Sequence, residues 1–348
     1  MGPFKLDKVP GVPDHPKLAL GRVGVLLVNL GTPDGTDIPS IRRYLREFLS
    51  DRRVIEVNPL LWQLLLNLVI LPFRSPKAAA AYREIWLSDP EESPLRRYTR
   101  EQALAVSKSF DASGPVIVDW AMRYGNPSIE SRIHALKEQG CDRLIVLPLY
   151  PQYSATTTAA VNDQVFRVLM KMRWQPAVRT AAAFHDHPAY IEALAKGVET
   201  HLATLDWEPE VILASFHGLP KRYFMAGDPY HCQCLKTGRL LREKLGLDEK
   251  QFRVTFQSRF GREEWLRPYT DEKLEEIAKE EGVKRLVVVT PGFVSDCVET
   301  LEEIAMGGRE TFEEAGGTHF TAIPCLNASD ESVEMLTRLI GEELAGWV

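Results

Sequence analysis

The sequence lacks the features that mark several large classes of protein. Its five cysteines are odd in number and irregularly spaced, unlike the cysteines of a disulfide framework. A net charge of -6 and a pI near 5.8, with no basic stripe, exclude nucleic acid as a partner, because phosphate binding needs a cationic face. Residues 1–20 contain no apolar run long enough for a secretory signal. We therefore expect a cytoplasmic protein with free thiols.

Long hydrophobic runs are also scarce. The one strongly apolar stretch runs from Leu60 to Phe73 and is about fourteen residues long, whereas a helix needs roughly twenty to cross a bilayer. Gln63 and Asn67, one helical turn apart, give it only a narrow polar face. The stretch therefore predicts a core helix, an interfacial segment or the wall of an apolar pocket.

Nucleotide and metal-cluster motifs are missing as well. Residues 31–35 are rich in glycine but lack the pattern of a dinucleotide site or a P-loop, so we interpret these glycines as turn residues. His231, Cys232 and Cys234 supply at most half of a zinc or iron–sulfur site, which needs four ligands at workable spacing. We expect no structural metal cluster.

Short β-branched runs alternate with amphipathic segments along the chain. Strands are predicted at residues 23–30, 116–120, 144–150, 178–182, 211–216, 253–257 and 286–290. Helical patterns lie between them, for example at 128–139, 189–205, 235–245 and 271–281. Buried strands separated by helices indicate βαβ units and parallel sheets. The predicted fold class is α/β, with two similar doubly wound, Rossmann-like domains and a cleft between them.

The length of 348 residues also favours two domains. Each half opens with a strand that ends in a small polar cluster, residues 29–33 in the first and 216–220 in the second. The join is predicted near residues 173–176. The expected units are residues 20–172 and residues 173–329. A final helix is expected at 330–348, and the sequence leaves open whether it packs on the first domain.

Side chains that can carry chemistry follow two strands of the second half. His217 follows one strand, and Glu299 and Glu303 follow another. Because ligands bind at the carboxyl ends of parallel strands, we expect these groups in one cleft, where they can bind a divalent metal or move protons. Plainer roles stay open: His217 can satisfy a core hydrogen bond, and Glu299 can complete a capping box with Asp296.

Taken together, the motifs resemble ferrochelatase, the family that inserts ferrous iron into a porphyrin at the last step of haem synthesis. The matching stretches follow the family's order from about residue 22 to 327: residues 30–33, 123–124, 147–154, 215–220, 227–230, 257–261, 265–268 and 293–301. A match of this length and order is highly specific.

The resemblance implies that His217, Glu299 and Glu303 are the catalytic residues. His217 and Glu299 would face each other across the metal path and act as metal ligands, with Glu303 extending an acidic line toward solvent. Metal insertion expels pyrrole protons, which a neutral imidazole can accept near neutral pH, while carboxylates relay protons and strip water from the ion. Whether His217 takes the proton or delivers the metal stays open.

The resemblance also implies which side chains hold the porphyrin. Phe293, Trp265 and the stretch from Leu60 to Phe73 would clamp and bend the ring, so that distortion becomes part of catalysis. The other candidates would hold propionates, line the pocket or order it: Leu30, Arg74, Ser93, Arg123, Tyr124, Tyr153, Ser154 and Gln257.

Three positions depart from patterns within the family. Cys297 stands where many relatives carry a histidine, so one imidazole of the proton path is missing. The chain stops at Val348 without the cysteine-bearing tail that holds an iron–sulfur cluster in some members, so we expect no cluster and no other cofactor, with Fe²⁺ as a substrate. Leu30 stands where relatives that use coproporphyrin have a tyrosine, which favours protoporphyrin IX.

The sequence therefore predicts a bacterial-type protoporphyrin ferrochelatase, a metal-inserting lyase that makes protohaem. A coproporphyrin III ferrochelatase, another tetrapyrrole chelatase, and a porphyrin or haem carrier without catalysis are the alternatives. The expected partners are protoporphyrin IX and ferrous iron, with peripheral membrane contact through Leu60 to Phe73 as a further possibility. The protein would be a monomer or a homodimer, and its metal selectivity stays open.

Overall fold

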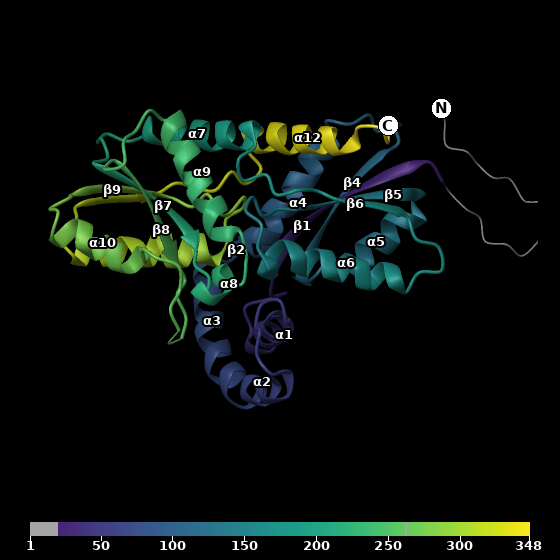
Figure 1. The fold of residues 1–348 in the computed structure, drawn as a ribbon, viewed down its shortest axis with the longest axis horizontal. Helices are drawn as coiled ribbons and strands as arrows, with labels where there is room; N and C mark the ends of the chain where they lie inside the picture. The colour runs from purple at the N-terminus through teal and green to yellow at the C-terminus, as the bar shows by residue number, and fades with distance from the viewer. Residues whose placement is uncertain (1–19, 262) are drawn as a thin grey trace, which may run out of the picture.

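Two parallel sheets lie side by side, with helices on their faces (Figure 1). The structure is a computed structural model that describes residues 20–261 and 263–348. The segment on which the absence of a secretory signal was argued therefore lies, apart from Leu20, outside the described residues.

The first sheet has its most buried strand near its centre. Its strands, in spatial order, are β4 (Val116–Gly125), β1 (Arg22–Thr32), β5 (Cys141–Pro148) and β6 (Ala177–Thr180). Val25 to Val28 of β1 are fully buried, as expected for a strand paired on both edges and covered on both faces. The helices of this half are α4 (Pro94–Ser107), α5 (Ile129–Glu138), the π-helix η2 (Ala155–Ala159) and α6 (Ala160–Met170).

The second sheet repeats this plan. Its strands, in spatial order, are β10 (His319–Ala322), β9 (Arg285–Val289), β7 (Val211–His217) and β8 (Phe252–Gln257). The helices of this half are α7 (Pro188–Leu202), α8 (Lys221–Met225), α9 (Tyr230–Lys244), α10 (Thr270–Lys279), the π-helix η3 (Glu299–Gly308) and α11 (Arg309–Glu314). In both sheets the first strand of the half lies between its second and third strands. The direction of the chain reverses there, so each half has its crevice at the carboxyl ends of its first and third strands.

The join between the halves lies later in the chain than the sequence pattern suggested. Residues 143–146 of β5 pair in parallel with residues 177–180 of β6, so the chain belongs to the first sheet as far as Thr180. The predicted join near residues 173–176 is therefore too early. The sequence pattern identified this strand but carried no information about its pairing partner.

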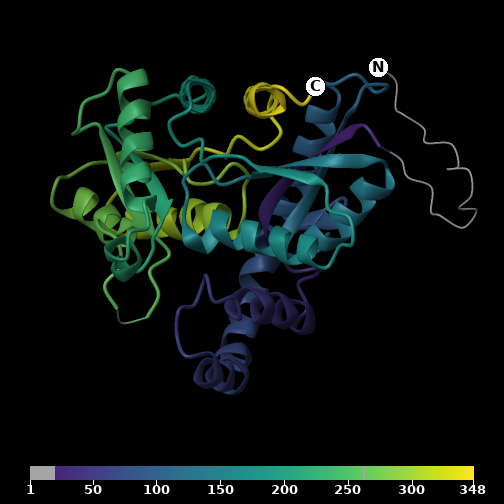
Figure 2. The same ribbon diagram turned by 45° about the vertical axis from the view of Figure 1, so that its right-hand side comes forward.

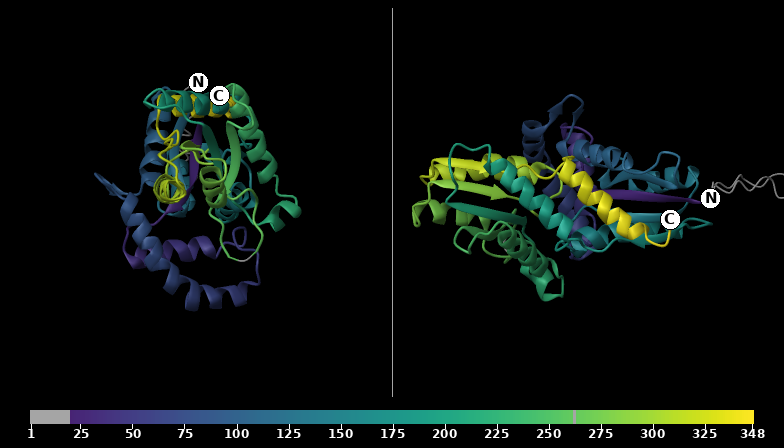
Figure 3. Two further views of the ribbon diagram at one scale, coloured as in Figure 1. Left: turned by 90° about the vertical axis from the view of Figure 1, so that its left-hand side faces the viewer. Right: turned by 90° about the horizontal axis from the view of Figure 1, so that it is seen from above.

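The last helix, α12 (Asp330–Leu344), packs on both halves. It lies beside α7, as Figures 2 and 3 show, and it also contacts α4 of the first half. Gln102 of α4 donates a hydrogen bond of 2.6 Å to the carbonyl of Asn327, just before α12. One core cluster contains side chains from β1, β7 and α12. The two halves therefore share a core.

A helical projection extends from the first half (Figures 1 and 2). It contains α1 (Ile38–Leu49), α2 (Pro59–Leu65), the π-helix η1 (Leu66–Ile70) and α3 (Leu71–Ile85), and a short hairpin of β2 (Leu87–Ser88) and β3 (Glu91–Glu92) follows. Asp37 caps α1 by accepting a hydrogen bond of 2.9 Å from the N–H of Ser40.

The apolar stretch from Leu60 to Phe73, which we call the apolar lip, is not a core helix. No residue of α2 is buried, and Leu60 and Phe73 are 81% and 77% exposed. By length and composition the helical run from Pro59 to Ile85 could cross a membrane. However, Leu66 and Leu71 are fully buried in a cluster with side chains of α1, which is packing within the fold and not contact with lipid. Of the three options that the sequence left open, the interfacial segment and the pocket wall remain.

Candidate active site

The turn after β7 places His217 at the crevice of the second half. The N–H of Gly218 donates to the carbonyl of Gln257 at 2.8 Å. A Cβ atom at position 218 would lie 2.7 Å from that carbonyl oxygen and 3.2 Å from the ring of Trp265. Only glycine fits this close approach without a shift of its neighbours. His217, Gln257 and Trp265 are therefore held together at one edge of the sheet.

A hydrogen bond determines the tautomer of His217. Its Nδ1 atom lies 2.6 Å from the carbonyl oxygen of Gly218. Because a carbonyl can only accept, the neutral ring must carry its proton on Nδ1 and keep a lone pair on Nε2. Nε2 of the half-buried ring is thus the atom that can accept a proton or bind a metal.

Two carboxylates follow β9 on η3. Glu299 begins this π-helix, and Glu303 lies about one turn later; both side chains are half-buried. Backbone hydrogen bonds in a π-helix run from i to i+5, and such segments are often found at functional sites. Glu299 therefore lies after the carboxyl end of β9, and His217 lies at the carboxyl end of the neighbouring strand β7.

Glu303 is held firmly by the segment after β8. Its carboxylate accepts hydrogen bonds from the N–H of Ser258 at 2.7 Å, the hydroxyl of Ser258 at 2.5 Å and Nε2 of Gln257 at 3.3 Å. Ser258 has a φ of 65°, in the left-handed region that side chains other than glycine seldom adopt. The two hydrogen bonds from Ser258 to Glu303 stabilise this strained backbone.

Gln257 connects the histidine side of the crevice to the carboxylate side. Its Nε2 donates to the carbonyl of Glu299 at 2.8 Å, and its Oε1 accepts from the hydroxyl of Ser215 at 2.9 Å. It lies opposite His217 in the β7–β8 register and is almost fully buried. His217, Gln257, Trp265, Glu299 and Glu303, all predicted from the sequence, therefore form one connected group.

The side chain of Glu299 does not take part in a capping box at the start of η3. Asp296 accepts hydrogen bonds from the Thr300 hydroxyl at 2.8 Å and the Asn327 side chain at 2.6 Å, and not from the N3 backbone. The helix begins without any side-chain cap at Val298. The capping-box interpretation of Asp296 and Glu299 is therefore wrong, because the side chain of Asp296 anchors a distant loop.

The surroundings of Glu299 are neutral hydrogen-bond donors. Burial raises the pKa of Tyr44, Tyr82 and Cys297, and the charge of Glu299 adds to the rise in each case. These groups stay protonated at neutral pH. Burial, followed by the charges of Glu303 and other carboxylates, also raises the pKa of Glu302. The site can therefore pass protons through carboxylates while its hydroxyl and thiol neighbours remain uncharged.

The wall of the site is apolar and comes from both halves. Leu30, at the end of β1, packs in the same cluster as Phe293, which follows β9. Cys297 is buried in this cluster with Leu95 and Met122. Leu30 and Phe293 thus belong to one apolar surface, of the kind that suits a flat apolar molecule.

Comparison with known proteins decides the family. The Ferrochelatase family model matches residues 22–344. The chain belongs to the ferrochelatase family. It is 60% identical to a ferrochelatase of Rhizobium meliloti and 59% identical to one of Allorhizobium ampelinum; each match covers 96% of this chain, and 98% and 97% of the relative. The membership predicted from the motifs is confirmed.

Solved structures confirm the fold. SirB from Bacillus subtilis with Fe³⁺ superposes with a TM-score of 0.56 at 11% identity, over 93% of this chain and 96% of that chain. The sirohydrochlorin chelatase SirB in complex with cobalt gives a TM-score of 0.51 over 93% and 97%. At this identity the likeness shows the fold alone, two α/β units with parallel sheets.

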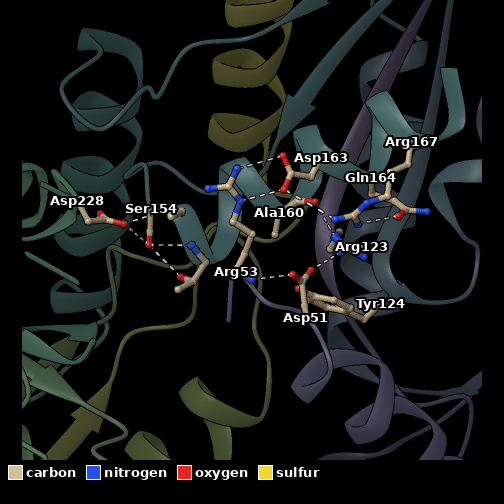
Figure 4. A network of polar contacts seen from close by, with 12 residues as sticks. Asp51, Arg53, Arg123, Tyr124, Ser154, Ala160, Asp163, Gln164, Arg167 and Asp228 are labelled. Atoms are coloured by element: carbon tan, nitrogen blue, oxygen red, sulfur yellow. Dashed lines mark hydrogen bonds and ion pairs between the residues drawn. The ribbon is translucent and has the colours of Figure 1, made fainter. Parts of the chain in front are cut away.

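Four of the predicted porphyrin contacts are buried in structural hydrogen bonds. Arg123 forms an ion pair with Asp51 and donates to the carbonyl of Ala160 at 2.8 Å, and the Tyr124 hydroxyl donates to Asp51 at 2.9 Å (Figure 4). Ser154 and Ser93 are also buried: the first donates to Asp228 at 3.0 Å, and the second caps α4. Of the roles that the resemblance left open for these four, the hydrogen bonds favour ordering the pocket, and contact with the porphyrin stays a prediction.

The remaining candidates have different positions. Arg74 of α3 lies 4.5 Å from the ring centre of Phe260, which follows β8, so the projection meets the second half here. Tyr153 is half-buried, with its N–H donating to Gln233 at 2.6 Å. Sequence reasoning named no role for Asp51, Asp228 or Ser258, because their partners Tyr124, Ser154 and Glu303 lie far away along the chain.

The described residues contain no group of three or more His, Cys, Asp or Glu side chains that could hold a metal ion. Cys234 is buried on α9 whereas Cys232 is exposed, so these two thiols do not converge. His231 packs against the rings of Phe224 and Phe256 instead. That His217 and Glu299 bind the metal ion stays a prediction from the resemblance.

Proposed function

We propose that this protein inserts ferrous iron into protoporphyrin IX and so makes protohaem in the last step of haem synthesis, acting as a metal-inserting lyase. The observation that carries the proposal is the lone pair on Nε2 of His217 at the same crevice as Glu299. Membership of the ferrochelatase family supports it.

The reaction needs a base and an acidic path. When a divalent ion enters the ring, the pyrrole N–H groups lose their protons; His217 accepts at Nε2 as a general base. Glu299 helps the ion to shed water and passes protons on to Glu303. The hydrogen bonds from Ser258 and Gln257 keep Glu303 in place during this transfer.

The choice of protoporphyrin follows from the wall of the crevice. Leu30 is a partly buried apolar residue beside Phe293, where it offers contact area and no hydroxyl to a metal or propionate. Trp265 stacks beside Gly218 and is positioned to press on a ring. An apolar wall of this kind suits the vinyl side of protoporphyrin better than the additional carboxylates of coproporphyrin.

We also propose that the enzyme works without a resident cofactor and attaches peripherally to the cytoplasmic membrane surface. Cys232 and Cys234, the two cysteines nearest in sequence, are exposed and buried respectively and do not form a shared site, which supports the first point. Leu60, Leu61 and Leu68 are 81%, 71% and 68% exposed, an apolar surface that suits weak, reversible membrane contact and the transfer of an insoluble porphyrin.

Anaerobic absorbance and fluorescence measurements with ferrous iron test the reaction, with protoporphyrin IX and coproporphyrin III in parallel. Protoporphyrin should be converted faster. His217→Ala should lower turnover about 100- to 10,000-fold while porphyrin still quenches protein fluorescence, and His134→Ala, an exposed histidine of α5, should change nothing. Faster conversion of coproporphyrin would move the protein to that branch, and porphyrin binding without turnover by wild type would make it a carrier.

A further inference from the structure

A polar cavity of about 690 Å³ lies at the foot of the apolar lip, between the loop that joins α1 to α2 and helix α6. Three arginines and three carboxylates line it: Arg52, Arg53, Arg167, Asp51, Glu56 and Asp163. Figure 4 shows Arg53, Asp163 and Arg167 at this place. None of the catalytic groups described above lines the cavity.

The carboxylates of the cavity are already paired. Asp51 forms its ion pair with the buried Arg123, and Asp163 accepts from Nε of Arg53 at 2.9 Å. Glu56 lies 3.3 Å from Arg222 of α8. None of them needs a further cation.

Two of the arginines that line the cavity lack a close ion pair. Within residues 20–261 and 263–348, Arg52 has no ion pair and is exposed. Arg167 is half exposed and lies 3.9 Å from Asp163, at the outer limit for an ion pair. The excess of positive charge extends along the chain. Residues 52–77 carry four cationic side chains and one carboxylate, although the whole protein has a net charge of -6.

Apolar side chains flank these cations on both sides. The apolar lip begins directly after the cavity-lining Pro59, with Leu60 and Leu61 exposed. On α6, Phe166 and Met170 follow Asp163 and Arg167 at helical spacing on one face, and they are 46% and 73% exposed. The cavity is thus a cationic site with an apolar border.

We propose that this cavity binds the phosphate of an anionic phospholipid while the apolar lip contacts the acyl boundary. The guanidinium groups of Arg52 and Arg167 match phosphate geometry, and the apolar border favours a lipid over a free phosphate ion. The inference rests on the proposed membrane contact and adds the lipid class that the protein selects.

Co-sedimentation with vesicles tests the inference. Phosphatidylcholine vesicles, with or without phosphatidylglycerol, are mixed with the full chain. Wild type should bind the vesicles that contain phosphatidylglycerol more tightly. Arg52→Gln with Arg167→Gln should weaken that binding about 25-fold, from about fivefold for each arginine near an anionic surface, and should leave binding to phosphatidylcholine unchanged. Arg338→Gln, which removes one exposed arginine of α12, is the control for the loss of a surface charge elsewhere and should have no effect.

Separate outcomes identify which proposal fails. If Leu61→Ser with Leu68→Ser binds both vesicle types as wild type does, the membrane contact itself is overturned. If the double leucine variant no longer sediments with vesicles but the double arginine variant binds as wild type does, only the headgroup site is overturned. If millimolar inorganic phosphate displaces wild type from phosphatidylglycerol vesicles as fully as the arginine substitutions do, the cavity takes a free anion and the lipid assignment is overturned.

Discussion

The two halves build the same sheet edge and use it differently. Gly31 follows Leu30 at the end of β1, and Gly218 follows His217 at the end of β7; each glycine passes over a carbonyl of the neighbouring strand, that of Tyr124 or Gln257. The backbone plan is therefore repeated. The preceding residue is leucine in one half and histidine in the other, so side chains and not topology decide which crevice carries the acid–base chemistry.

Asp51 in the first half and His217 in the second also differ in how many of their polar atoms have hydrogen-bond partners within the protein. In the first half, Asp51 accepts from Arg123, Tyr124 and the backbone of Arg53, all in or beside a closed, buried network. In the second half, His217 and Glu299 stay half-buried, and Nε2 of His217 is left open. One half therefore supplies a rigid scaffold, whereas the other keeps its groups available for reaction.

The glycines offer the largest test of this comparison. At Gly31, φ is 119° and an added Cβ would lie 1.9 Å from the carbonyl of Tyr124, so Gly31→Ala should lose more than about 4 kcal/mol or fail to fold. At Gly218 the approach is 2.7 Å, so Gly218→Ala should lose about 1–3 kcal/mol and should reduce turnover by shifting His217 and Trp265. Urea unfolding and the chelatase assay measure both effects.

Gly341→Ala is the control for the glycine pair. No atom lies within 4 Å of an added Cβ there, and the position is inside α12, so the change should stabilise the protein by about 0.5–1 kcal/mol. Equal losses at Gly31 and Gly218 would contradict the distinction between a purely structural edge and a reactive one.

The ion pairs of the first half give a smaller difference. Asp51 and Arg123 have side chains 5% and 7% exposed, so Asp51→Ala leaves a buried, unpaired arginine and should lower the free energy of unfolding by about 3–5 kcal/mol. Asp163 and Arg53 are 30% and 44% exposed, and Asp163→Ala should lower it by less than about 1 kcal/mol. Urea denaturation at neutral pH compares the two; similar losses would mean that the Asp51 network does not hold the scaffold.

Local pattern and distant pairing explain what the sequence could reveal. Strand ends followed by glycine are short-range signals, so His217 and the crevice beside it were predictable. The role of Arg123 depends on Asp51, which lies 72 residues away, and that of Ser154 depends on Asp228, 74 residues away. Neither partner stands out in the sequence. The pattern could therefore predict both side chains as candidates for the pocket, but it could not show that each also binds a distant partner within the fold.

The smallest expected effect concerns the acidic side of the reactive half. Burial first, and then the charges of Glu303 and Glu84, raise the pKa of Glu302 in the folded state above its ordinary value of 4.5. A carboxyl with a raised folded pKa binds its proton more tightly in the folded protein, so its contribution to stability is favourable at low pH and is lost as the pH rises through the folded pKa. At neutral pH the charged group opposes folding.

Glu302→Gln should therefore stabilise the protein at pH 7 by a few tenths of a kcal/mol, because solvent still screens this half-buried group, and should have no effect below about pH 4. Thermal unfolding at the two pH values measures the difference, with Glu314→Gln at an exposed position of α11 as the control. The opposite sign at pH 7 would mean that the carboxylates of η3 support one another through a bound cation or shared proton. The neighbouring carboxylates of η3 in the second half would then not lower the stability of the protein. The two halves would differ less in how far their polar groups stabilise the fold.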